Sequence, residues 1–468
     1  MIKDETSILS YVVFDEIDSW ETVFRLCSGF LTDCSKKRLQ QINVPSVIVE
    51  KQYIDKDYRN TFSKFHSKKF VTPTARCIRL HLFTKDIDFE NPETIQWESA
   101  YAGYIILRPT LPNSIGRTLL KPDLFNLKGS YLCLCTEKVM VNGVGMKIQG
   151  FPFISQDTDA TVCAQSSLWM LLRFFSNRYR WYKETYPSDL TSLVKSHPQG
   201  RSMPGAGLTM MQMADALRDL GFAPLLYDKN EYKVDFLKFA YAYMESGFPL
   251  LLGLPQHVVV AIGHLSDFSA PGKVSSFDYF KGFIINDDNG LPYAKLSDNK
   301  SDNIFSYDLS SIDSFLVPLP DKVFLSAEQF DTLVTQLLKL LQNDGNKIPV
   351  LKRMFLTTGR SFRKKALERY GHLPEVRSFY LKNPLPHFIW VCEVSEPDIY
   401  SKSLQCTGEI IWDATRNAFD SHLGLAIHLP EVLIFDNGAA WNMREDYRQI
   451  EGVKEIPYKI YNNNLEEV

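Results

Sequence analysis

The sequence has no apolar run long enough to cross a bilayer and no large excess of either charge. Its longest apolar stretch, Phe248 to Ile262, is interrupted by Pro249, Pro255 and His257, whereas a membrane-spanning helix needs about 20 consecutive apolar residues. The formal net charge is −3, which argues against bulk electrostatic attraction to nucleic acid or to an anionic membrane. We therefore expect no membrane segment and no nucleic-acid partner.

The sequence also lacks the patterns of exported and metal-binding proteins. Its first residues, MIKDETSILSYVVFDE, carry acids beside a short apolar run and do not have the basic-then-apolar order of a secretory signal. The eight cysteines are scattered, and no disulfide framework is visible. The close pair Cys133 and Cys135 has no partner pair, so a buried strand is preferred over a metal site there. These absences favour a cytoplasmic protein without metal or cofactor.

The composition is that of a folded chain with several cores. Apolar residues make up 45% and charged residues 23% of the 468 residues, which is ample material for packing. A chain of this length is expected to form two or three domains of roughly 100–200 residues. The fold class that we predict is α+β, with an N-terminal mixed α/β domain over residues 1–146, a middle domain over 147–318 and a C-terminal mixed α/β domain over 319–468.

Strand patterns dominate the N-terminal region. Asn142-Gly143 separates two alternating segments and predicts a hairpin turn. The predicted strands contain β-branched or alternating apolar residues: PSVIVEKQYI, ARCIRLHLF, YAGYIILRP and SYLCLCTEKVMV.

The middle region begins with helices and ends with strands. One helix is predicted from about Cys163, and a second has capping-box spacing at Thr209 and Gln212 with Gly221 as its stop. Buried strands are predicted for FPLLLGL, HVVVAIGH and KGFIINDDNGLPY. The loop from Ser196 to Gly207, between the two helices, is expected to border any cleft in this region.

A proline-flanked segment, FLVPLPDKVFL, predicts the boundary to the third region. Ser326 and Gln329 have the spacing of another capping box. The strands expected beyond it are HFIWVCEV, GEIIWDAT and EVLIF. The apolar residues of the helix that the box opens repeat at the spacing of one helical face: Phe330, Leu333, Val334, Leu337, Leu338 and Leu341.

Cys163 stands where a polar stretch gives way to the first helical pattern. A cysteine attacks as its thiolate, and the unpaired N–H groups and aligned dipoles of a helix start favour that anion. A free cysteine is also among the most buried residue types. Cys163 taken alone is therefore either a nucleophile or a small core residue.

Three further features favour a nucleophile. Gln156, seven residues before Cys163, can direct its amide at the oxygen of an attacked carbonyl and form an oxyanion hole with N–H groups of the helix start. His257 opens a strand and can act as general base. Asn286, Asp287 and Asp288 follow the next strand, where one of them can hold the imidazole in the right tautomer.

In this order the segments QDTDATVCAQSSLWM, QHVVVAIGH and IINDDNGLPY resemble the signature segments of papain-like cysteine peptidases. The most similar branch is the compact bacterial one that includes bacteriocin-leader-processing peptidase domains. The resemblance covers the middle third of the chain and implies a nucleophile helix packed on an antiparallel sheet. It implies Cys163 as nucleophile, His257 as base, Asp287 as orienting residue and Gln156 in the oxyanion hole.

The chain departs from that family at several positions. Ala164 replaces the glycine that usually follows the nucleophile, and Asp288 stands where a proline often follows the acid. The gap between His257 and Asp287 is also longer than in compact members. These departures bear on the shape of the substrate cleft more than on the chemistry.

The leading hypothesis is a cysteine peptidase or isopeptidase that cleaves a protein or peptide substrate through a thioester. The same residues would also serve acyl transfer to an amine, because other nucleophiles can intercept a thioester. A third hypothesis is a catalytically idle papain-like scaffold whose outer domains bind a partner. His257 and His264 are both candidates for the base. On an uninterrupted strand they face opposite sides, so only one of them can meet Cys163. The resemblance selects His257 and Asp287, with Asn286 as the reserve.

Overall fold

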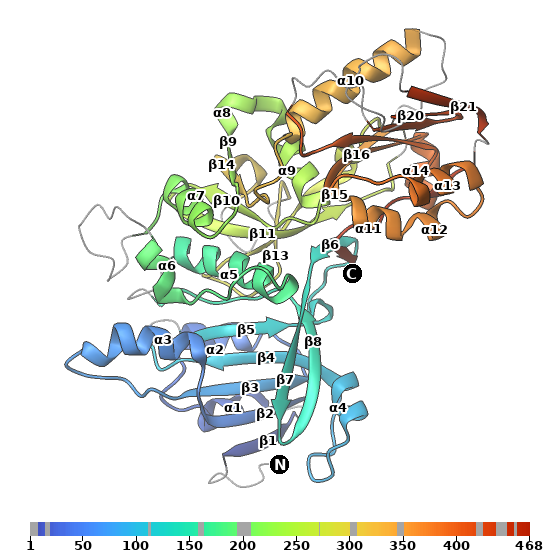
Figure 1. Cartoon of the computed structure of the whole chain (residues 1–468). Coiled ribbons are helices and arrows are strands. Elements are labelled where there is room, and N and C mark those ends of the chain that lie inside the picture. Colours follow the sequence, from blue (N-terminus) through green and yellow to red (C-terminus); the bar gives the residue numbers. More distant parts are fainter. Residues whose placement is uncertain are drawn as a thin grey trace.

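The fold is described from a computed structural model, which places residues 8–14, 19–110, 114–157, 163–193, 207–270, 272–299, 307–343, 351–417, 425–436, 447–453 and 456–468. These residues form a mixed α+β fold with antiparallel sheets. Figure 1 shows an N-terminal sheet, a middle sheet and a C-terminal sheet stacked along the long axis of the molecule. None of the described helices has the length and apolar character that crossing a bilayer requires.

The N-terminal region is built on a five-stranded sheet whose strands follow chain order. Three of the predicted strand segments coincide with its second to fourth strands. The third and fourth strands are buried along their whole length, including Arg79 and His81 of the third. The strands are β1 (Leu9–Val13), β2 (Ser46–Tyr53), β3 (Cys77–Phe83), β4 (Tyr101–Leu107) and β5 (Ile115–Leu120), and the helices are α1 (Ser19–Leu26), α2 (Asp33–Leu39), α3 (Lys56–Lys64) and α4 (Thr94–Ala100).

A long hairpin leads from this region to the next. It consists of β7 (Cys135–Val141) and β8 (Val144–Gly150). Its tip has positive φ at both Asn142 and Gly143, 49° and 78°, which is the backbone that an Asn-Gly hairpin turn adopts. The fourth predicted strand segment, SYLCLCTEKVMV, forms two strands and not one. The first of them, β6 (Ser130–Cys133), ends before β7 begins. Cys133 and Cys135 are both buried.

The middle region is built on an eight-stranded sheet. Its main path runs β13-β12-β11-β10-β14-β9, and β6 pairs with both β11 and β23. A Cβ at Gly263 of β11 would lie 2.3 Å from the carbonyl oxygen of Tyr131, so the close approach of β6 requires glycine there. The remaining strands are β9 (Leu225–Asp228), β10 (Leu250–Leu254), β11 (His257–Ser266), β12 (Phe280–Asn286), β13 (Ala294–Ser297), β14 (Ser314–Val317) and β23 (Leu465–Glu467). Two of the eight strands, β6 and β23, lie outside residues 147–318.

Helices lie on this sheet both where it faces the N-terminal region and where it faces the C-terminal region. In Figure 1, α5 lies between the middle sheet and the N-terminal region, whereas α9 lies between the middle sheet and β15. The second predicted helix is α7, and its capping box at Thr209 and Gln212 is present. Gly221 follows it with a φ of 88°, as expected of a helix stop. The helices are α5 (Cys163–Arg178), α6 (Pro187–Leu193), α7 (Met210–Asp219), α8 (Lys229–Tyr232) and α9 (Phe236–Glu245).

The C-terminal region is built on a six-stranded sheet in the order β15-β16-β18-β19-β20-β21. The three predicted strand segments coincide with β16, β18 and β20. The predicted apolar face of α10 packs against the core, and Ser326 N donates to Gln329 Oε1 at its start. The strands are β15 (Leu351–Thr358), β16 (Phe388–Ser395), β17 (Gln405–Cys406), β18 (Gly408–Asp413), β19 (Ala426–Leu429), β20 (Glu431–Asp436), β21 (Tyr447–Val453) and β22 (Tyr458–Lys459). The helices are α10 (Ala327–Asn343), α11 (Gly359–Lys364), α12 (Ala366–Arg369), α13 (Pro374–Lys382) and α14 (Pro397–Ser403).

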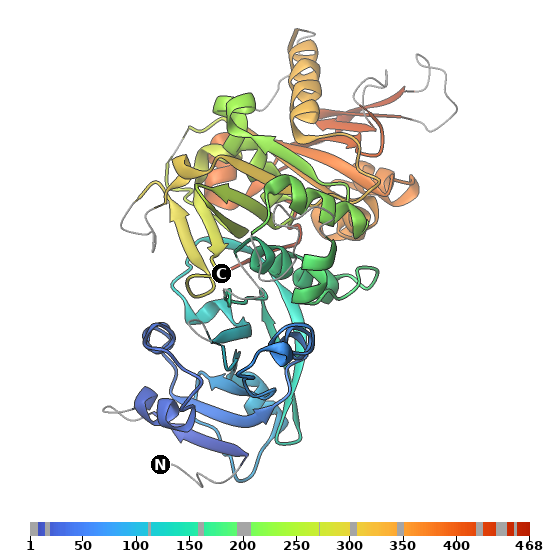
Figure 2. The ribbon, with the colours of Figure 1, turned by 90° about the vertical axis from the view of Figure 1, so that its left-hand side faces the viewer.

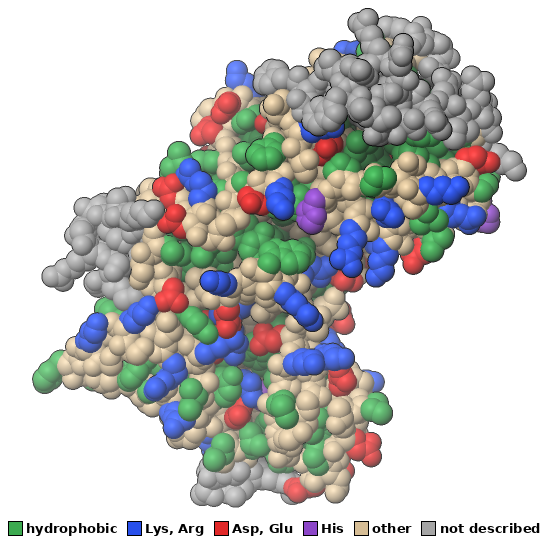
Figure 3. Space-filling model, viewed as in Figure 1, with side chains coloured by type: hydrophobic (Ala, Val, Ile, Leu, Met, Phe, Trp, Pro, Cys, Tyr) green, Lys and Arg blue, Asp and Glu red, His purple; other side chains and the backbone are tan. Residues whose placement is uncertain are grey.

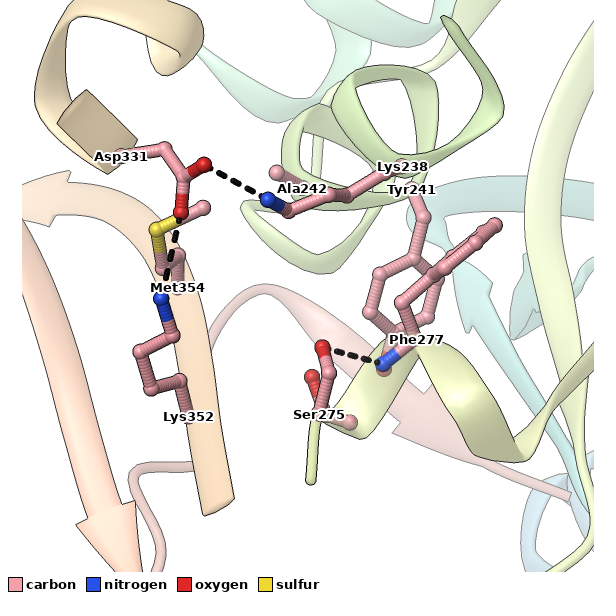
Figure 4. Close-up of a pocket in the computed structure, with 9 residues that line it drawn as sticks. Lys238, Tyr241, Ala242, Ser275, Phe277, Asp331, Lys352 and Met354 are labelled. Carbon is pink, nitrogen blue, oxygen red and sulfur yellow. Dashed lines mark hydrogen bonds and ion pairs between the residues drawn. The ribbon is translucent and has the colours of Figure 1, made fainter. Parts of the chain in front are cut away.

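Polar side chains join the middle and C-terminal regions. Figure 4 shows Asp331 of α10 between Lys238 of α9, at 2.6 Å, and Lys352 of β15, at 3.7 Å. Beside them, the buried Arg353 pairs with Glu245 of α9 and with Glu393 of β16. Loss of one partner of the buried pairs would leave an uncompensated charge between the two regions.

Apolar packing also runs through the whole molecule. One cluster of buried side chains contains residues of all three regions, from Val47 through Trp169 and Leu252 to Trp390. The view in Figure 2 shows the regions in contact along the same axis. On the face drawn in Figure 3, basic and acidic side chains are interspersed over much of the surface, in keeping with the small net charge.

Candidate active site

Cys163 is the first residue of α5, so the prediction that a helix begins near it is confirmed. The helix is anchored by the fully buried Leu168 and Trp169. Ser167 Oγ donates a 2.8 Å hydrogen bond to the carbonyl oxygen of Val258 in β11, which ties α5 directly to the strand that His257 opens. Cys163 itself is half-buried, unlike six other cysteines that are buried. Its thiol is therefore positioned by a rigid helix and is still accessible.

His257 and Asp287 meet because β11 and β12 are antiparallel neighbours, so that the start of one strand lies near the end of the other. His257 is the first residue of β11 and Asp287 follows β12 directly. His257 Nε2 and Asp287 Oδ1 are 3.0 Å apart. The Asp287 side chain is only 1% exposed, so its bond with the imidazole is shielded from water.

The imidazole also reaches the thiol. Hydrogen bonds to Asp287 and to Cys163 both act on His257. Since Nε2 is taken by Asp287, Nδ1 is the ring nitrogen left for the thiol. Burial alone lowers the pKa of His257, but these two bonds and the charges of Asp287 and Asp288 outweigh it and raise the pKa to about 10. The site therefore favours an imidazolium at neutral pH.

A second carboxyl stands beside the first. Asp288 is fully buried, and its Oδ1 lies 3.7 Å from His257 Nε2. Burial and the charge of Asp287 raise the pKa of Asp288 to about 7, against the opposite effect of His257. Asp288 therefore keeps its proton in mild acid, where Asp287 is the nearer acceptor for the imidazole.

Asn286, the reserve candidate for the orienting residue, forms hydrogen bonds with other residues than His257. Its side-chain amide donates to the carbonyl oxygen of Pro152 at 3.2 Å and accepts from Tyr293 N at 3.0 Å. These bonds hold the loop after β12 against the segment before α5. The structure thus brings Asp287, and not Asn286, into hydrogen-bonding contact with His257.

Gln156 lies on the same side as the thiol, but it contacts a residue that the sequence did not single out. Its Nε2 donates a 2.6 Å hydrogen bond to Asn289 Oδ1. Both side chains are half-buried. The segment from 158 to 162, between Gln156 and Cys163, lies outside the described residues.

These side chains open into a cleft of about 520 Å³. Tyr307 covers one side of the imidazole, with its ring nearly parallel to that of His257 and 6.4 Å from it, centroid to centroid. The cleft is lined by Gln156, Cys163, Pro255, Gln256, His257, Asp287, Asn289 and Tyr307. All four residues predicted for the site therefore border one cavity. The loop predicted to border it, Ser196 to Gly207, lies outside the described residues except for Gly207.

His264 lies in a different environment. Its Nε2 is 2.8 Å from Glu245 Oε2, and its Nδ1 is 3.0 Å from Ser266 Oγ. The prediction that His257 and His264 face opposite sides assumed an uninterrupted strand, but β11 has a register shift between Ala261 and Gly263. The two histidines are therefore distinguished by the residues that they contact, and not by the alternation of side chains along one regular strand.

The described residues include one group of acids and histidine close enough to hold a metal ion. It consists of His257, Asp287 and Asp288, whose ligand atoms lie within 4.8 Å of one another. The His257–Asp287 hydrogen bond already accounts for their closeness, and we assign no metal to them.

Asn289 and Tyr307, like Pro255 and Gln256, are cleft residues that the sequence pattern did not assign to the site. Asn289 lies in the quoted segment IINDDNG, but its type and position fit an ordinary turn residue equally well. Tyr307 follows a polar stretch of sequence and matches no motif. Only the folded chain brings them beside Gln156 and His257.

We compared the chain with protein-family models, with curated proteins and with solved structures, and found no match in any of the three comparisons.

Proposed function

We propose that the protein is a cysteine peptidase or isopeptidase with a papain-like catalytic domain. The observation that carries the proposal is a single imidazole, His257, that lines one cleft with the half-buried thiol of Cys163 and lies 3.0 Å from the buried carboxyl of Asp287. That arrangement, at the rim of a cleft, meets the requirements for nucleophilic catalysis by cysteine.

In the proposed reaction, His257 takes the proton of Cys163, and the thiolate attacks the carbonyl carbon of a peptide or isopeptide bond. The oxyanion that forms accepts hydrogen bonds from Gln156 and from backbone N–H at the start of α5. His257 then gives its proton to the leaving amine as the C–N bond breaks, which leaves a thioester on Cys163. Water, deprotonated by His257, hydrolyses the thioester and restores the thiol.

Asp287 has a supporting role in this reaction. It accepts a hydrogen bond from the Nε2–H group of His257 and so keeps Nδ1 directed at the sulfur. It also stabilises the imidazolium that exists between the two proton transfers. Its burial makes both effects stronger than they would be in water.

Alkylation by iodoacetamide tests the proposal, because Cys34 is an exposed cysteine on the same chain and serves as an internal control. We expect Cys163 to be modified faster than Cys34 at pH 6, as read by peptide mass spectrometry. His257 can take the proton of Cys163 as its sulfur attacks, and a thiolate reacts much faster than a thiol. His257→Ala should remove the advantage of Cys163, and His264→Ala should not.

Equal rates at Cys163 and Cys34 would instead favour an idle scaffold.

Acyl transfer is distinguished from hydrolysis in a second experiment. An acylated Cys163 is offered water alone or water with hydroxylamine, and the product is weighed. A hydrolase releases mainly acid, whereas an acyltransferase passes the acyl group to the amine.

A further inference from the structure

One turn connects the base of the proposed mechanism to the oxyanion donor. Asp287 Oδ1, which accepts from His257, also accepts a 2.8 Å hydrogen bond from Asn289 N. Gly290 N donates to the carbonyl oxygen of Asp287 at 2.9 Å and closes the turn. The backbone of Asn289 is therefore fixed by the same carboxylate that orients the imidazole.

The side chain of Asn289 extends this fixed turn to Gln156. Its Oδ1 accepts one N–H of the Gln156 amide at 2.6 Å, and an amide nitrogen carries two. The second N–H remains for a bound carbonyl oxygen. A free glutamine side chain loses rotamer entropy when it is ordered, so an amide held before the reaction begins is a more effective oxyanion donor.

We propose that Asn289 is a positioning residue, which holds the Gln156 amide toward the oxygen of the carbonyl that Cys163 attacks. This inference rests on the proposed function. It makes the turn from Asp287 to Gly290 the common support of two catalytic groups, the imidazole through Asp287 and the oxyanion donor through Asn289.

Two reagents separate this role from a general effect on the thiol. Iodoacetamide alkylates sulfur by displacement at a saturated carbon, where no oxyanion forms. An acyl reagent, p-nitrophenyl acetate, acylates the same sulfur through a tetrahedral oxyanion and releases p-nitrophenolate. Loss of an oxyanion donor should therefore slow acylation and leave alkylation unchanged.

We expect Gln156→Ala to lower the acylation rate of Cys163 about 100-fold, the usual cost of one oxyanion donor, and Asn289→Ala to lower it about 10-fold, because Gln156 is still present but no longer held. Asn289→Leu, which keeps the volume and lacks the acceptor, should behave like Asn289→Ala. The double variant Gln156→Ala/Asn289→Ala should be no slower than Gln156→Ala, because Asn289 acts through Gln156.

Asn230→Ala is the matched control, since Asn230 is an exposed asparagine of α8 that does not line the cleft. It should acylate near the wild-type rate. Additive losses in the double variant, or wild-type acylation in Asn289→Ala, would overturn the role of Asn289 alone. If wild-type Cys163 is alkylated no faster than Cys34, the proposed function and this inference are overturned together.

Discussion

At the scale of single residues, Cys163 is the position where chemistry and packing make opposite predictions. Cys163→Ala should abolish acylation by p-nitrophenyl acetate at this site. It should change the free energy of unfolding by less than about 1 kcal/mol, because a half-buried sulfur contributes little apolar area. Urea denaturation checks the second part, with Cys34→Ala as the control. A loss of several kcal/mol would identify Cys163 as a core residue.

The charge on His257 gives a pH dependence with a defined sign. Its pKa is raised to about 10, so the imidazolium that protonates the leaving group is lost as the pH rises through that value. Activity should fall there. The contribution of His257 to stability follows the same direction, complete below its ordinary pKa of 6.5 and lost as the pH rises through about 10.

Asp288 provides a sharper test of the same electrostatics. Its charge is one cause of the raised pKa of His257, so Asp288→Asn should move the alkaline limit of activity to lower pH. Stopped-flow acylation rates with a p-nitroanilide, whose amine leaving group needs the imidazolium proton, check this across pH, with Asp215→Asn, an exposed acid of α7, as the control. An unchanged alkaline limit would show that Asp288 does not act on the imidazole.

The sequence identified the residues of the site whose roles depend on type and order, and missed those whose roles depend on the folded turn. Gln156, Cys163, His257 and Asp287 border one cleft. The hydrogen bond from Gln156 to Asn289 depends on how the loop after β12 folds back. The periodicity of the sequence does not predict the conformation of that loop. The register shift between β11 and β12 likewise has no signature in the sequence pattern.

At the scale of helices and strands, prediction succeeded where one segment carries its own signal. The capping box of α7 and the Asn142-Gly143 turn are local, and both are present. Helix α9 was not predicted, because it is buried along nearly its whole length between two sheets. A helix that is apolar on all sides lacks the periodicity by which an amphipathic helix is recognised.

Helix α5 is held to the N-terminal region by buried charge. Arg173 of α5 pairs with Asp57 at 2.7 Å, and Trp169 Nε1 donates to the same carboxylate at 3.1 Å. Arg173→Ala should lower the free energy of unfolding by up to about 3–5 kcal/mol, because it removes the nearer of two arginines from a buried carboxylate and leaves Arg117, at 3.7 Å, beside it. Arg218→Ala, which breaks an exposed pair with Asp215, should cost roughly 1 kcal/mol or less.

The loss in Arg173→Ala should also depend on pH. Burial raises the pKa of Asp57 to about 6, against the opposite effect of Arg173. Below that value Asp57 is largely neutral and needs its partner less, so the loss measured by urea denaturation should be larger at pH 8 than at pH 5. Asp57→Asn in the same background should recover part of it. An equal loss at both pH values would assign the effect to packing of the arginine stem alone.

At the scale of the whole molecule, the middle sheet takes strands from three parts of the chain. β6 comes before residue 147 and β23 lies near the end of the described chain, yet both belong to the sheet that carries His257. Pairing between strands so distant in sequence leaves no local pattern. For this reason the sequence indicated three regions but gave no sign that they share a sheet and a continuous apolar cluster.

A fragment of residues 147–318 should therefore fail to fold alone, although it contains Gln156, Cys163, His257 and Asp287. It lacks β6, which pairs with Gly263 to Leu265 of β11, and it exposes α9, whose buried face packs on β15 in the full chain. An unpaired strand edge and uncovered apolar surface favour aggregation. The fragment contains one cysteine, Cys163. We expect the fragment to show no cooperative thermal transition by circular dichroism, and its Cys163 to be alkylated by iodoacetamide at pH 6 more slowly than Cys163 of the full chain. A fragment that melts cooperatively and whose Cys163 is alkylated as fast as in the full chain would show that the middle region is an independent domain and that β6 and β23 are dispensable additions to its sheet.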